Sequence, residues 1–266
     1  MGTLLRSIRR RFSLYRLDNR FASHDFRVVV VGCGGTGGYL AEGLCRILPP
    51  NAQLVLLDHD RVEERNLIRQ NFTREDLGGF KSEVLARKLS KKADRPVGYC
   101  TLPVGMVEFR FSGLVLGCVD NGPARRDIEE KMEMTQWAWW VDSGNGENYG
   151  QILIGNSPEM DYPFRLSTMT CYYLPLPTIQ VPNLLLQAPR VRSCAEAVEA
   201  GEQGPTINQV MASLMLEVAR RIIGGTCSWM QLFVDMDTGS VVPVMATPDT
   251  VSSITGVKKR KLEFKD

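Results

Sequence analysis

The chain is poor in the residues that build metal centres and histidine-dependent active sites. Its 266 residues include two histidines, His24 and His59, so we expect neither a histidine-rich metal site nor a Ser-His-Asp hydrolase. The seven cysteines are odd in number, irregularly spaced and without a CxxC pair. This pattern argues against a disulfide framework and against a zinc site, and it indicates that the cysteines are free thiols.

The sequence also lacks long apolar runs and a strong excess of charge. No run of about 18 apolar residues and no charged-then-apolar leader is present, so we expect no membrane span and no signal peptide. We therefore expect a cytoplasmic protein. A formal charge of +2 argues against a dedicated nucleic-acid-binding protein.

What the chain does have is a glycine-rich turn after an apolar strand, VVVVGCGGTGG, from Val28 to Gly38. Glycine has no Cβ, so the backbone can bend sharply and approach a ligand, and the start of the next helix attracts anions. Asp58 ends the following apolar run, where a carboxylate can meet ribose hydroxyls. The stretch predicts a nucleotide site; the alternative is a βα turn that binds nothing. The glycines expected at the ligand are Gly32, Gly34, Gly35 and Gly37.

Apolar runs near 28–32, 54–58, 97–102 and 114–120 are separated by helical patterns. This rhythm predicts an α/β, Rossmann-like, mainly parallel sheet with flanking helices. Ligands of such sheets bind where the strands end. Asp120, at the end of GLVLGCVD, is therefore expected to face the same crevice as the glycine turn.

The second half is expected to contain a long crossover loop, a helix and a hairpin. Residues 155–193 are rich in proline and show no periodicity, which is typical of a functional or mobile loop. Apolar spacing predicts a helix from Ile207 to Gly224, and WMQLFVD and SVVPVMA predict a C-terminal β-hairpin. We thus expect an arm over 1–26, one domain over 27–245 and a C-terminal tail over 246–266, of which VKKRKLEFKD, 257–266, is basic and expected to be frayed.

The arm over 1–26 is rich in arginine. It can be a solvated extension, or it can cross to the phosphate site of a partner subunit. Its arginines are Arg6, Arg9, Arg10, Arg11, Arg16 and Arg20.

The segment DHDRVEERNLIRQNFTREDLGGFK, from Asp58 to Lys81, narrows the class. A dehydrogenase has no physical need for so many phosphate-binding side chains here, whereas an enzyme that uses a nucleoside triphosphate does. Arg69 offers a planar fork for phosphate oxygens, and Lys81 offers a mobile point charge. Asp120 could hold a magnesium ion that bridges the phosphates.

Four motifs in order, GCGGTGG, DxDxxxxxNLxRQ, GxxK and CVDN, resemble those of the ThiF/MoeB/HesA family, bacterial relatives of the ubiquitin-activating enzymes. The likeness runs from about Phe26 to Ile223. It implies an ATP site in which Asp58 binds ribose and Asp120 coordinates Mg²⁺. It further implies phosphate binding by Asn66, Arg69, Gln70 and Lys81, with Asp60 and Asn121 in the same motifs also at the cofactor.

The resemblance implies adenylation. The C-terminal carboxylate of a ubiquitin-like or sulfur-carrier protein attacks the α-phosphate of ATP and gives an acyl adenylate and pyrophosphate. It also implies a homodimer. The family's N-terminal arginine has no secure match here: Arg20 fits by local context, and Arg16 or the Arg6–Arg11 cluster could substitute. The zinc-binding CxxC pairs of many members are absent.

The segment RSCAEAVEAGEQGPTINQ resembles the family stretch that carries a cysteine, and Cys194 occupies that place. Cys194 either accepts the activated acyl group or is unreactive, and Cys171 is the second candidate. The pieces SCAEA and GPTINQ also resemble ThiF-like proteins of plasmid-borne gene clusters.

Three other functions stay open. The first is adenylation of a peptide or tRNA-linked carboxylate, and the second is a non-catalytic scaffold with the same fold. An NAD oxidoreductase is disfavoured, because Arg69 and Lys81 would have no task and His59 is the one evident proton-transfer group.

Overall fold

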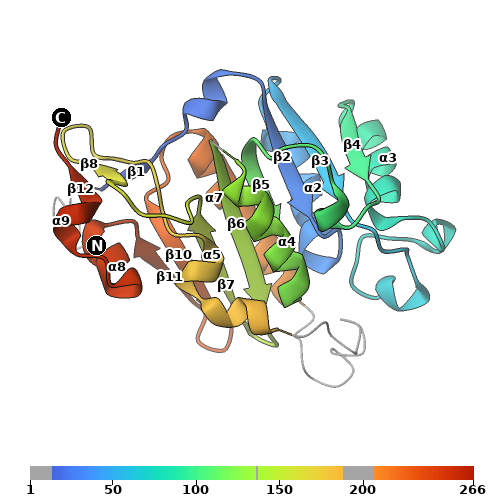
Figure 1. Cartoon of the computed structure of the whole chain (residues 1–266). Helices are drawn as coiled ribbons and strands as arrows, with labels where there is room; N and C mark the ends of the chain where they lie inside the picture. Colours follow the sequence, from blue (N-terminus) through green and yellow to red (C-terminus); the bar gives the residue numbers. More distant parts are fainter. Residues whose placement is uncertain (1–13, 136, 188–205) are drawn as a thin grey trace, which may run out of the picture.

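The computed structural model describes residues 14–135, 137–187 and 206–266. An eight-stranded sheet forms the centre of this part, with helices on both faces (Figure 1). Its strand order is β11-β10-β7-β6-β5-β2-β3-β4. The strands are β2 Phe26–Val31, β3 Ala52–Leu57, β4 Val97–Cys100, β5 Gly113–Gly117, β6 Ala138–Asn145, β7 Tyr149–Gly155, β10 Trp229–Asp235 and β11 Ser240–Met245.

Strands β6, β5, β2, β3 and β4 are parallel, and β7, β10 and β11 extend the sheet as antiparallel neighbours. The predicted Rossmann-like, mainly parallel sheet and the C-terminal hairpin are confirmed. The strand expected over 114–120 ends earlier, at Gly117, so Asp120 lies in the turn that follows it.

Side chains of successive strand residues alternate between two hydrophobic cores. Val28 and Val30 join the core under α2, α3 and α7, whereas Val29 and Val31 join the core under α4. This explains why the strand is apolar without interruption from Val28 to Val31, as expected for a strand buried on both faces. The main helices are α2 Gly35–Ile47, α3 Lys81–Ala93, α4 Gly122–Glu133 and α7 Ile207–Ile223.

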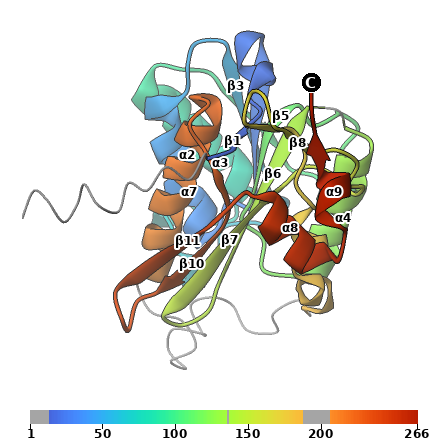
Figure 2. The ribbon, with the colours of Figure 1, turned by 90° about the vertical axis from the view of Figure 1, so that its left-hand side faces the viewer.

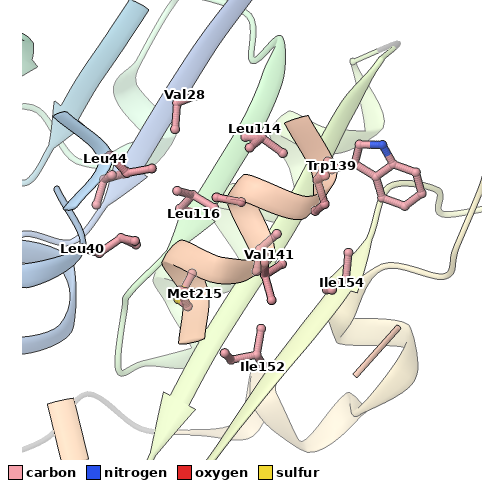
Figure 3. Close-up of a cluster of buried hydrophobic side chains, with 14 of the residues drawn as sticks. Val28, Leu40, Leu44, Leu114, Leu116, Trp139, Val141, Ile152, Ile154 and Met215 are labelled. Atoms are coloured by element: carbon pink, nitrogen blue, oxygen red, sulfur yellow. The ribbon is translucent and has the colours of Figure 1, made fainter. Parts of the chain in front are cut away.

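Helices α2 and α7 lie side by side on one face of the sheet (Figure 2). Figure 3 shows Met215 of α7 among Leu40 and Leu44 of α2 and the side chains of β5 to β7. The predicted helix over 207–223 is thus confirmed, and its methionines are core residues. Its packing brings the first turn of α7 close to the glycine turn that precedes α2.

Residues 155–187 contain short elements where the sequence indicated a loop. Two-residue strands form a second sheet in the order β1-β9-β8-β12, and α5 and a 3-10 helix follow. Strands this short cannot produce a detectable periodicity, which is why the pattern did not reveal them. Their bounds are β1 Arg16–Leu17, β8 Phe164–Arg165, β9 Thr170–Cys171, β12 Glu263–Phe264, α5 Pro177–Gln180 and η5 Pro182–Leu186.

The segment 246–266 is not frayed, contrary to our expectation. It forms α8 Pro248–Thr255 and α9 Lys259–Leu262, and it ends in β12. Val251 and Leu262 are completely buried against the larger core. Two apolar anchors among many charged residues were too few to distinguish a packed segment from a tail.

Single-turn 3-10 helices complete the described chain, at η1 Arg20–Ser23, η2 Glu64–Asn66, η3 Arg74–Asp76 and η4 Val104–Met106. No helix in the described residues is long and apolar enough to cross a membrane.

Candidate active site

A cavity of about 1040 Å³ opens at the edge of the sheet where the parallel strands end. It collects predicted residues from four separate segments of the chain. The predicted residues that line it are Gly32, Gly34, Gly35, Asp58, Asp60, Gln70, Lys81, Asp120 and Asn121. Gly37, Asn66 and Arg69 do not line it.

The glycine turn is closely packed at two positions. Gly32 has a φ of +90°, and a Cβ there would lie 2.7 Å from the carbonyl oxygen of Cys118. A Cβ on Gly37 would lie 1.8 Å from the carbonyl oxygen of Gly32. These two positions require glycine. Gly37 thus maintains the conformation of the turn, although it does not line the cavity. Helix α2 begins at Gly35, and its N-cap residue supplies no side-chain hydrogen bond.

Asp58 connects the glycine turn to the next predicted motif. It is 8% exposed, and its Oδ2 accepts a hydrogen bond of 2.6 Å from the main-chain N–H of Cys33. Its Oδ1 accepts one of 2.8 Å from the N–H of Asp60. Burial raises the pKa of Asp58, and the Lys81 ammonium acts in the opposite direction.

Lys81 is the first residue of α3 and is 8% exposed. Its Nζ lies 2.8 Å from Oδ2 of Asp60, and both residues line the cavity. Ligand atoms of Asp58, His59 and Asp60 lie within 4.8 Å of one another, close enough to share a metal ion. The Lys81 ammonium already supplies a positive charge there, so this group does not need a metal to be neutralised.

Asp120 and Asn121 lie between β5 and α4. Asn121 is the N-cap of α4 and accepts a 2.9 Å hydrogen bond from the N–H of Ala124. Its Nδ2 donates to Oδ1 of Asp120 at 3.2 Å, and the exposed Asp120 lines the cavity. A carboxylate oxygen in this position suits Mg²⁺, which prefers oxygen ligands and takes one or two carboxylates together with phosphates.

Asn66 and Arg69 are buried next to the cavity rather than in it. Asn66 closes a capping box, because its Oδ1 accepts a 2.9 Å hydrogen bond from the N–H of Glu63. Arg69 is 8% exposed. Both precede Gln70, which lines the cavity, and their phosphate roles stay predictions.

Sequence reasoning missed Arg125, which is 1% exposed and lines the cavity. Its Nε donates to Oδ2 of Asp142 at 2.9 Å, its Nη1 to Oε1 of Gln187 at 2.7 Å and its Nη2 to the carbonyl of Val119 at 2.8 Å. It therefore ties the ends of β5 and β6 to residue 187. The sequence holds no sign that distinguishes it from the exposed Arg126.

Ser143, Asn145 and Asn208 were also missed, and all three line the cavity. Asn208 lies on the buried face of α7, together with Met211 and Met215. A polar side chain at an inward position of an otherwise apolar helix was the signal that could have identified it.

The structure tests one of the two cysteines predicted to accept the acyl group. Cys171 is completely buried, and burial raises the pKa of its thiol well above the ordinary value. It is therefore not an accessible thiolate, and the second candidate for acyl transfer was wrong. Cys33 is completely buried in the core. Cys194 lies outside the described residues.

Arg20 lies at the opposite end of β6 from the cavity. Its Nε contacts Asp18 at 2.7 Å, and its guanidinium lies 4.2 Å from the ring centre of Trp137. The cavity of its own chain is thus out of its reach. Arg16 pairs with Thr170 in the small sheet, and Arg6 to Arg11 lie outside the described residues.

The mainly parallel sheet, the glycine turn and the cavity at the strand ends define an α/β protein of the Rossmann-like class. Across residues 6–238 the chain matches the ThiF family, and it belongs to that family.

The chain is similar to ubiquitin-like modifier-activating enzyme 5 of Drosophila virilis, with 32% identity over 141 residues, 47% of this chain and 34% of that protein. The Dictyostelium discoideum enzyme of the same name is 33% identical over 144 residues, 47% of this chain and 36% of that protein. The matches thus span about a third of these curated relatives.

Among solved structures, E. coli MccB is similar in fold. MccB with ATP has a TM-score of 0.58 and 17% identity, covering 84% of this chain and 64% of that one. MccB with MccA-N7isoASN has a TM-score of 0.59 and 17% identity, covering 87% and 67%. At this identity the likeness supports the Rossmann-like fold alone.

Proposed function

We propose that the protein is an ATP-dependent adenylyltransferase that activates the C-terminal carboxylate of a ubiquitin-like or sulfur-carrier protein. The observation that carries the proposal is the convergence of the glycine turn, Asp58, the Lys81–Asp60 pair and Asp120 on one cavity. Membership of the ThiF family and the match to ubiquitin-like modifier-activating enzyme 5 support it.

Each side chain has a task that its position suits. Asp58 accepts hydrogen bonds from ribose hydroxyls, and the N-terminus of α2 faces the phosphates. Lys81 exchanges its contact with Asp60 for phosphate oxygens and neutralises the charge that grows on them. Asp120 would hold Mg²⁺, which would supply positive charge to stabilise the phosphates.

The chemistry is one displacement at phosphorus. A carboxylate oxygen of the substrate forms a bond to the α-phosphorus, and the bond from that phosphorus to the bridging oxygen breaks. Pyrophosphate leaves with the electron pair, and no proton has to move. The step therefore needs positioning and charge stabilisation rather than a general base, and the cavity supplies charged and hydrogen-bonding groups for both.

Lys81→Met tests the phosphate role, because it keeps the length of the side chain and removes its charge. We expect pyrophosphate release to fall about 10²- to 10³-fold, the usual cost of losing one charge-stabilising group. Lys91→Met is the matched control, since Lys91 is exposed on the same helix. Equal activity of both variants would remove Lys81 from the mechanism.

A second candidate substrate is a peptide, which the MccB complex with the MccA peptide favours. Purified ubiquitin-like proteins, sulfur-carrier proteins and synthetic peptides can be compared by pyrophosphate release, each with a free and an amidated C-terminus. An amide has no negatively charged carboxylate oxygen to attack the phosphorus, so only free carboxylates should react. Release that is independent of the C-terminus would contradict carboxylate activation.

We propose Cys194 as the acceptor of the activated acyl group, on the resemblance of its sequence context. Cys194→Ser should retain adenylate formation and lose a thiol adduct seen by mass spectrometry. Cys171→Ser is the control, because that thiol is buried. An adduct that persists in Cys194→Ser would exclude the assignment.

We propose that the protein acts as a homodimer. Arg20 cannot reach the cavity of its own chain, so a phosphate site that Arg20 serves belongs to a second copy. Sedimentation at micromolar concentration should show a dimer. A monomer with full activity would exclude a shared site.

A further inference from the structure

Asn208 joins three elements at the inner wall of the cavity. It lies in the first turn of α7 and is 5% exposed. Its Oδ1 accepts hydrogen bonds from Oγ1 of Thr36 at 3.2 Å and from Nδ2 of Asn145 at 3.3 Å. Both partners can donate to an oxygen, and this fixes which side of the Asn208 amide carries the oxygen and which carries the nitrogen.

The Nδ2 atom of Asn208 is buried and has no hydrogen-bond partner among the described residues. A Cβ built on Gly35 would lie 2.7 Å from it, so Nδ2 lies against the first residue of α2. Buried donors nearly always have an acceptor, because leaving one unpaired costs stability. The described residues therefore leave Nδ2 available to donate to a bound molecule.

Two other buried polar atoms of the same cavity lack a partner in the described part of the chain. They are Oε1 of Gln70 and Oγ of Ser143. Unsatisfied groups from three segments thus gather around one space, as in a site prepared for a polar ligand. The N-terminus of α2 adds a preference for an anion.

We propose that Asn208 donates a hydrogen bond from Nδ2 to a phosphate oxygen of the bound nucleotide. It is then a phosphate-binding residue supplied by the second half of the chain, in the cavity that Lys81 and Asp58 also line. The inference rests on the proposed nucleotide site. It also gives a reason for glycine at position 35, since any side chain there would displace the donor.

The test measures binding of Mg-ATP and of adenosine, which has no phosphate, by calorimetry. A hydrogen bond to a charged acceptor corresponds to about 10- to 150-fold in affinity. Asn208→Ala should weaken Mg-ATP binding by at least about tenfold and leave adenosine binding unchanged. Asn208→Asp keeps an acceptor for Thr36 and Asn145 but places negative charge near the phosphates, so it should lose at least as much.

Gln209→Ala is the matched control, because Gln209 is exposed in the same turn of α7. It should bind both ligands like the wild type, and thermal unfolding should show that all variants are folded. Equal losses for Mg-ATP and adenosine in Asn208→Ala would overturn the proposal in favour of a structural role. Unchanged Mg-ATP binding would overturn it as well, with the proposed function intact. A wild type that binds neither ligand would overturn both.

Discussion

The main-chain N–H of Cys33 donates a 2.6 Å hydrogen bond to Oδ2 of Asp58. The residue expected to bind ribose therefore also fixes the glycine turn. Its other oxygen holds the N–H of Asp60, whose own carboxylate contacts Lys81. The two motifs that are separate in the sequence are thus one hydrogen-bonded unit.

Asp58→Ala should lower the free energy of unfolding by about 1–3 kcal/mol, because it leaves the buried N–H of Cys33 without an acceptor. Asp58→Asn keeps an oxygen in place and should lose less. Denaturant unfolding of the three proteins measures the difference. Equal losses in the two variants would show that the hydrogen bond is not what Asp58 contributes.

Asp58 also makes the stability of the folded protein depend on pH, in a direction that follows from its pKa. Burial raises the pKa of Asp58 above its ordinary 3.8. The folded state therefore holds the proton of the Asp58 carboxyl group more tightly than the unfolded state does. The contribution of this proton to the stability of the folded state is complete below pH 3.8, and it is lost as the pH rises through the folded-state pKa. The stability of the wild type relative to Asp58→Asn should decline as the pH rises from 3.8. A relative stability that increases over that range would contradict the shift.

Gly37 and Gly38 offer a paired test of the turn. A Cβ on Gly37 would lie 1.8 Å from the carbonyl oxygen of Gly32, whereas the nearest atom to a Cβ on Gly38 is 3.7 Å away. Gly37→Ala should cost about 3 kcal/mol or more and abolish nucleotide binding, since the backbone must move. Gly38→Ala should be neutral or up to about 1 kcal/mol stabilising, because alanine favours a helix. Thermal unfolding distinguishes them, and equal effects would refute the packing argument.

Arg125→Met should destabilise the protein by about 3–5 kcal/mol, because it leaves the Asp142 carboxylate buried without its cation. Arg126→Met, at the exposed neighbouring position, should stay within about 0.5 kcal/mol of the wild type. Denaturant unfolding checks both. A loss under 1 kcal/mol in Arg125→Met would mean that water replaces the ion pair.

A feature could be predicted from the sequence where it depends on residues that are close together in the chain. The valines of β2 and the glycines after them act locally, so the strand, the turn and α2 could be predicted together. Arg125 depends on contacts between segments far apart in the chain, and no local pattern marks it. Asn208 has a local mark, a polar residue at an inward position of an apolar helix, but its contacts with Thr36 and Asn145 come from distant segments. The two-residue strands of the small sheet are also held by distant partners, such as β1 by β9 and β12 by β8. Family resemblance supplied the order of the site residues, whereas the structure supplied the hydrogen bonds that join them.

Thermal unfolding with Mg-ATP, with NAD and with no ligand, on the wild type and on Asp120→Ala, tests the central claim most directly. At about 100 times its dissociation constant, a ligand adds about 2.7 kcal/mol to the stability of the native state. A triphosphate-using site predicts a rise with Mg-ATP alone, reduced or lost in Asp120→Ala. A rise with NAD alone would contradict the account and make the glycine turn an ordinary dinucleotide site.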